Sequence, residues 1–159
     1  MLNIIIWTMK KILIALTLFV AGMNHLLAQN INYDPELAKK LNADEYGMRL
    51  YTFVLLKSGD KQNLSKSETD SIFRGHMNNI VRLENEGKLF VAGPFGANPY
   101  GYRGLFIFYE TDIKKVEEMV NTDPAVSSGI LKPEIFNWYG SAALPIYHDY
   151  HNKIWNKMP

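Results

Sequence analysis

The chain has 159 residues, of which 17 are basic and 16 acidic, and it contains no cysteine. The near-neutral charge argues against a nucleic-acid-binding protein, which needs a basic surface to neutralise phosphates. Without cysteine the chain forms no disulfides and carries no lipidated cysteine, so an exported form depends on packing or association for its stability.

Residues 1–28 are typical of a secretory signal peptide. A charged start at Met9-Lys10-Lys11 precedes an apolar run from Ile12 to Ala21, and Ala28 is the expected cleavage position. The apolar run is shorter than the ~18 residues of a spanning helix, although retention as an anchor is the alternative. Residues 1–8 either lengthen the signal or reflect a misassigned start. We therefore expect a periplasmic or secreted protein without a stable membrane span after cleavage.

The mature chain is expected to begin with a polar N-terminal arm, residues 29–48, that contains a short helix from Pro35 to Leu41. The aromatic and β-branched run from Arg49 to Lys57 predicts the first strand of a domain that extends to residue 140.

A capping box predicts where the first long helix begins. Ser65 is followed three residues later by Glu68, and Gly87 is placed to end the helix after about Glu86. Apolar residues recur three and four apart along this segment, as on the buried face of a helix. They are Ile72, Phe73, Met77, Ile80 and Leu83.

The remaining elements complete an alternating pattern. Strands are predicted at residues 88–94 and 104–110, separated by a glycine-rich loop, residues 95–103. A second helix begins at Thr111 or Asp112, with Ile113, Val116, Met119 and Val120 inward, and a last strand covers residues 132–140. The order βαββαβ predicts an α+β, ferredoxin-like fold.

The strands also predict an association. A sheet with one face in water should alternate apolar and polar residues, but residues 105–109 and 51–56 are almost continuously apolar. Because both helices occupy one face, the other face is expected to pack against a second copy of the sheet, as a homodimer.

His76 and Asp123 are the candidate catalytic residues. His76 lies between Ile72 and Ile80 on the inward side of the first long helix, where a histidine is otherwise a satisfied core residue. A carboxylate bonded to one ring nitrogen would fix the tautomer and leave the other nitrogen as a base. Asp123 followed by Pro124 is also a preferred helix start, and capping does not exclude the second role.

Other residues are candidates for binding a small-molecule ligand. Gly93 and Pro94 place backbone near the predicted pocket, and Phe95 and Tyr102 on the following loop could form an aromatic lid. The Ser127 hydroxyl could donate a hydrogen bond to a ligand, or it could bond to a nearby backbone group. Each of these residues also has a purely structural interpretation.

The C-terminal extension, residues 141–159, contains His148, Asp149 and His151. Two histidines three residues apart could share a helix face as metal ligands, but no third strong donor is near. Docking of an amphipathic tail through Ile146, Tyr150 and Ile154 explains the pattern more simply, so no metal site and no cofactor are predicted.

The residues resemble the YCII-related (YciI-like) domain over about residues 49–140. The resemblance is carried by His76, the Glu86–Pro94 and Gly104–Phe108 segments, the Asp123–Gly129 turn and Trp138. It implies a dimeric α+β barrel whose active site uses a histidine and an aspartate that match His76 and Asp123. Where a reaction is assigned in this family, it is lyase-like.

Together these observations predict an exported, YCII-like small-molecule enzyme that uses a His-Asp pair in general acid/base chemistry. The alternative is a non-catalytic, dimeric ligand-binding or accessory module of the cell envelope.

Overall fold

The structure is a computed structural model that describes Trp7, residues 30–61 and residues 63–156. The predicted signal peptide, apart from Trp7, lies outside the described residues. Within the described part of the chain, no helix is long and apolar enough to cross a membrane.

The chain divides into two units, Met1–Leu37 and Ala38–Pro159. In the first unit, Asp34 Oδ1 accepts hydrogen bonds from the backbone N–H groups of Glu36 and Leu37, each at 3.0 Å. These bonds cap the start of helix α2 (Pro35–Lys40), where the sequence predicts a short helix.

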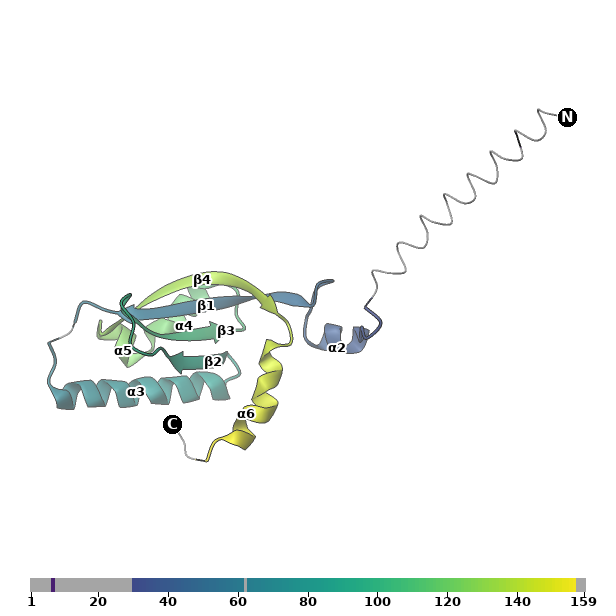
Figure 1. The fold of residues 1–159 in the computed structure, drawn as a ribbon. Coiled ribbons are helices and arrows are strands. Elements are labelled where there is room, and N and C mark those ends of the chain that lie inside the picture. Colours follow the sequence, from purple (N-terminus) through teal and green to yellow (C-terminus); the bar gives the residue numbers. More distant parts are fainter. Residues whose placement is uncertain (1–6, 8–29, 62, 157–159) are drawn as a thin grey trace. The chain divides into compact units, whose positions relative to one another are not determined.

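The second unit has the predicted βαββαβ order (Figure 1). Its antiparallel sheet has the strand order β2-β3-β1-β4, which confirms the ferredoxin-like fold. The elements are β1 (Met48–Ser58), α3 (Lys66–Asn85), β2 (Leu89–Pro94), β3 (Tyr102–Phe108), α4 (Ile113–Asn121), α5 (Pro124–Ser127), β4 (Leu131–Ser141), the 3-10 helix η1 (Leu144–Tyr147) and α6 (His148–Ile154).

Helix α3 begins and ends as its sequence predicts. The Ser65 N–H donates to Glu68 Oε2 at 2.9 Å, while the Glu68 N–H donates to Ser65 Oγ at 3.3 Å, so the capping box is formed. Gly87, just beyond the C-cap residue Glu86, has φ of +66°, a conformation that glycine adopts without steric cost.

Strand β3 lies two residues earlier than predicted. The predicted range ended at Glu110, but the Glu110 carboxylate instead accepts from the N–H groups of Thr111 and Asp112 at 2.9 Å each. These bonds turn the chain toward α4, whose cap is Asp112, so the strand ends at Phe108.

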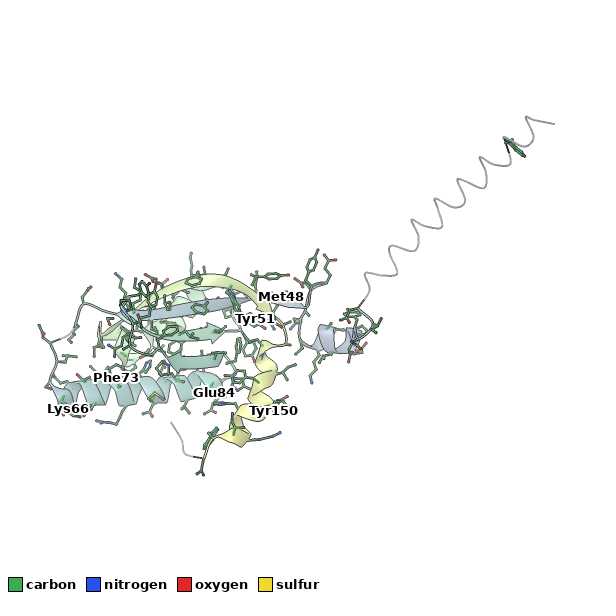
Figure 2. The ribbon with its side chains drawn as sticks, in the orientation of Figure 1. Met48, Tyr51, Lys66, Phe73, Glu84 and Tyr150 are labelled. Atoms are coloured by element: carbon green, nitrogen blue, oxygen red, sulfur yellow. The ribbon has the colours of Figure 1, made fainter. Side chains whose placement is uncertain are left out.

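The helices cover one face of the sheet and form the main core with it. Val54 and Phe108 from the sheet are fully buried there with Val116 of α4. Phe73, which Figure 2 labels on α3, packs against this core. The prediction for Ile113 was wrong: it is 40% exposed, because it lies in the first turn of α4, ahead of the buried residues.

The other face of the sheet is also apolar, as the strand pattern predicts. Tyr51 lies opposite Trp138 and Phe53 opposite Phe136, with stacked rings at centroid distances of 5.9 and 5.3 Å. Trp138 and Phe136 nevertheless remain 37% and 44% exposed. An apolar face of this kind needs a cover, and homodimerisation stays a prediction.

Candidate functional site

His76 and Asp123, far apart in the sequence, lie within hydrogen-bonding distance. His76 Nδ1 is 2.6 Å from Asp123 Oδ2. The Asp123 side chain is fully buried and that of His76 is only 12% exposed. A short contact between a ring nitrogen and a carboxylate in a dry environment is a strong, charge-assisted type of hydrogen bond.

Asp123 divides its two oxygens between two tasks. Oδ1 accepts from the Ala125 N–H at 2.8 Å and caps α5, with Pro124 in the first turn, while Oδ2 faces His76. The capping role and the partner role therefore coexist, each on its own oxygen.

The His76 ring is held by aromatic neighbours as well as by Asp123. It stacks on Phe106 of β3 with a centroid distance of 5.9 Å and meets Phe73 of its own helix edge-on at 5.8 Å. These contacts leave the ring little freedom to rotate.

Gly75 brings α3 and α5 close enough for the pair to form. A Cβ atom at this position would lie only 2.8 Å from Pro124 Cγ, so a side chain there would push the two helices apart. The absence of a side chain at residue 75 therefore allows α5 to lie close enough to α3 for Asp123 to reach His76.

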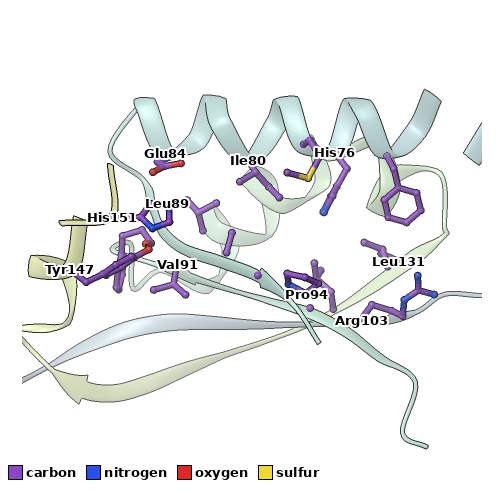
Figure 3. Close-up of a pocket in the computed structure, with 17 residues that line it drawn as sticks. His76, Ile80, Glu84, Leu89, Val91, Pro94, Arg103, Leu131, Tyr147 and His151 are labelled. Carbon is purple, nitrogen blue, oxygen red and sulfur yellow. The ribbon is translucent and has the colours of Figure 1, made fainter. Parts of the chain in front are cut away.

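The hydrogen bond also fixes the chemistry of the ring. An ionised carboxylate can only accept, so in the neutral ring Nδ1 carries the proton and Nε2 has the free lone pair. The ring points from α3 into a cavity that it lines (Figure 3). A lone pair held toward a cavity is the arrangement that a general base requires.

The cavity has a volume of about 800 Å³ and lies between α3 and the edge of the sheet at β2 (Figure 3). Most of the residues that line it are apolar. They are Leu56, Phe73, Met77, Ile80, Leu89, Phe90, Val91, Ala92 and Leu131, with Gly93, Pro94 and Gly104.

The predicted ligand-binding residues separate into two groups. Gly93 and Pro94 line the cavity, whereas Phe95, Tyr102 and Ser127 are not among its lining residues. The ring of Phe95, just after β2, lies 6.3 Å from the ring of Tyr102, the first residue of β3. Ser127 is exposed, and its hydroxyl bonds to the Pro124 carbonyl at 3.4 Å, which is the local role that its sequence context allowed.

Four polar residues that line the cavity were missed by sequence reasoning: Glu84, Arg103, Tyr147 and His151. Glu84 could have been found, because it follows His76 and Ile80 at intervals of four along α3. Tyr147 and His151 carry no such signal, since only the folding back of the C-terminal segment brings them to the cavity.

The C-terminal segment docks differently from the predicted amphipathic tail. Tyr150 and Ile154 are 64% and 77% exposed, which corrects their predicted docking role. The Tyr147 hydroxyl and His148 Nε2 instead bond to the carbonyl of Phe90 in β2, the histidine at 2.7 Å. Burial raises the pKa of Tyr147, and the nearby Glu84 charge raises it further.

No group of three or more His, Cys, Asp or Glu side chains within the described residues is arranged to hold a metal ion. The polar groups that do converge are the His-Asp pair and the residues at the cavity wall.

Comparison with known proteins does not establish a family. No protein-family model matches the chain, and no curated protein matches it significantly, so the YCII-related assignment stays a prediction. Among solved structures, the chain is similar to 5-chloro-2-hydroxyhydroquinone dehydrochlorinase from Burkholderia phenoliruptrix AC1100, in complex with 2,5-dihydroxybenzoquinone. The identity is 18% and the TM-score 0.41, over 55% of this chain and 92% of that one.

Proposed function

We propose that this chain is a YCII-like small-molecule enzyme in which His76 is the general base and Asp123 orients it. The observation that supports the proposal is the 2.6 Å contact between His76 Nδ1 and the buried Asp123 Oδ2, with the ring at the wall of a cavity. A carboxylate in this position holds the ring in one tautomer and stabilises the imidazolium that forms when Nε2 takes a proton.

The reaction type is proton abstraction followed by elimination. Nε2 takes a proton from an acidic C–H or O–H of the substrate, and the electron pair left behind expels a leaving group from a neighbouring position. The imidazolium then returns the proton to solvent or to the leaving group. The apolar lining of the cavity suits this step, because excluding water strengthens the pairing of the imidazolium with Asp123.

Base activity can be tested without knowing the leaving group. The protein is incubated in D₂O with carbon acids such as β-keto esters, nitroalkanes and hydroxylated arenes, and deuterium incorporation is followed by NMR. His76→Ala should lower the exchange rate by roughly 10²-fold or more. Tyr150→Ala is the control, because it removes an exposed ring that does not line the cavity. Unchanged exchange in a folded His76→Ala protein would refute the proposal.

The second candidate function is a non-catalytic, small-molecule-binding or accessory module of the cell envelope. The mostly apolar cavity lining favours it, since such a lining binds ligands without any chemistry. Binding of the same compounds with no deuterium incorporation in the wild-type protein would identify this function.

The proposal includes export and a homodimer. Export predicts a mature N-terminus at Gln29, which mass spectrometry of the exported protein would measure. The exposed rings of Phe136 and Trp138 on the open sheet face support association with a second copy. Sedimentation velocity at micromolar concentration should give a dimer, and Trp138→Glu should give a monomer. A monomeric wild-type protein would contradict this part of the proposal.

A further inference from the structure

The cavity has a second polar end, away from His76. His76, Ile80 and Glu84 follow one another along α3 and all line the cavity (Figure 3). Glu84 comes eight positions after His76 in the helix, so the two side chains start about 12 Å apart along the helix axis. Tyr147 and His151 lie near Glu84 at that end.

This end is held in place by an irregularity of the edge strand. The pairing of β2 with β3 shifts register between Leu89 and Val91, which leaves Phe90 unpaired in a bulge. The Phe90 carbonyl accepts from both the Tyr147 hydroxyl and His148 Nε2. The C-terminal segment is therefore anchored to the strand by two bonds to one carbonyl, and Tyr147 and His151 form a wall of the cavity.

The polar groups at this end are mainly acceptors. The Glu84 carboxylate can only accept hydrogen bonds, and His148 Nδ1 lies 3.6 Å from its Oε1. The Tyr147 hydroxyl uses its proton on Phe90 and keeps its lone pairs. His151 contacts the Tyr147 and His148 rings, and no other described residue forms a hydrogen bond to its ring. A ligand group that bonds to Glu84 and Tyr147 must therefore supply a hydrogen-bond donor, while the His151 ring can accept or donate.

We propose that Glu84, Tyr147 and His151 form a recognition subsite for a hydroxyl or ammonium group on an apolar ligand whose opposite end lies at His76. The subsite names a substrate class for the proposed enzyme, and in that respect it rests on the proposed function. The ligand is an elongated, mostly apolar molecule with a reactive group at one end and a hydrogen-bond donor at the other.

Three probes with one biphenyl body test this proposal by isothermal titration calorimetry. They are 4-hydroxybiphenyl, 4,4′-dihydroxybiphenyl and 4′-(aminomethyl)biphenyl-4-ol, which differ only in the group at the far end. The wild-type protein should bind at least one of the last two about tenfold more tightly than the first, since a hydrogen bond to a charged acceptor is worth about that much. A gain for the ammonium alone indicates an amine ligand, and a gain for the hydroxyl alone indicates an alcohol or phenol.

Glu84→Gln and His151→Leu should each remove most of this preference. Glu118→Gln, which deletes an exposed carboxylate on α4, is the matched control and should keep it. Equal affinity for the three probes, no binding of any of them, or a preference that survives both variants would overturn the proposal. Because the preference is measured on binding alone, it persists even if His76→Ala shows that His76 is not a base.

Discussion

Replacing Asp123 with asparagine should keep the cap of α5 and reverse the hydrogen bond to His76. The asparagine Oδ1 can still accept from the Ala125 N–H, which lies 2.8 Å from the present oxygen. The amide group that replaces Oδ2 then donates to Nδ1, so the ring is forced into the tautomer that is protonated at Nε2. A ring in that tautomer presents a proton to the cavity in place of a lone pair.

The cost in stability follows from which contacts survive. Asp123→Asn exchanges a buried hydrogen bond to a charged group for a neutral one, a difference of about 1 kcal/mol. Asp123→Ala also loses the cap and leaves the buried Ala125 N–H unpaired, for a total of about 3–4 kcal/mol. In a domain of this size, each kcal/mol lowers Tm by roughly 3–6 °C.

The assay combines thermal unfolding with ¹⁵N NMR of the His76 ring. The wild-type ring should be protonated at Nδ1 and the Asp123→Asn ring at Nε2. The variant should also incorporate deuterium into the carbon acids about 10²-fold or more slowly than the wild-type protein. A wild-type ring protonated at Nε2 would refute this reasoning. So would equal destabilisation by asparagine and alanine, because the Oδ1 cap would then contribute nothing.

Three further predictions concern the supports of the site and fold. Gly75→Ala should lower Tm although alanine has the better helix propensity, because the added methyl would lie 2.8 Å from Pro124, the first residue of α5. Such an overlap costs about 1–3 kcal/mol, and a rise in Tm would contradict this prediction. Tyr147→Phe removes the hydrogen bond from the hydroxyl to the Phe90 carbonyl, which contributes about 1 kcal/mol to stability, and should speed amide hydrogen exchange in α6. Tyr150→Phe changes an exposed ring and should not. The Tyr139 hydroxyl donates to Asp44, which lowers the pKa of Asp44 below 3.8 and raises that of Tyr139 to about 12. The contribution of Asp44 to stability is therefore present above pH 3.8 and is lost as the pH falls through its lowered pKa. The contribution of Tyr139 to stability is present below pH 10 and is lost as the pH rises through about 12. The free energy of unfolding of Tyr139→Phe, measured with urea, should depend less on pH at both extremes than that of the wild-type protein. An unchanged dependence would rule out a contribution of the Tyr139–Asp44 hydrogen bond.

Local chemistry made most of the element boundaries predictable. The capping box at Ser65 and Glu68 and the glycine at residue 87 set the ends of α3 through bonds between near neighbours. The end of β3 was misplaced because Glu110 looks like a strand residue in sequence but uses its carboxylate to turn the backbone.

The candidate site was predictable only in part. His76 and Asp123 could be paired from the sequence because the fold order places the end of α4 beside α3, and each residue stands at a position with a clear helical context. Glu84 follows the same helical spacing. The position of Tyr147 and His151 at the cavity could not be predicted, because it depends on a bulge in β2 that no short-range sequence pattern indicates.

The sequence alone therefore determined the order of elements, the apolar character of both sheet faces and the two residues of the His-Asp pair. These depend on periodicity and capping, which act over a few residues along the chain. Only the tertiary structure decided the 2.6 Å contact between Nδ1 and Oδ2, the cavity beside it and the wall that the C-terminal segment adds. These depend on the close approach of α5 to Gly75 and on the two bonds that the Phe90 carbonyl accepts from the C-terminal segment, which exist only once distant segments have packed together.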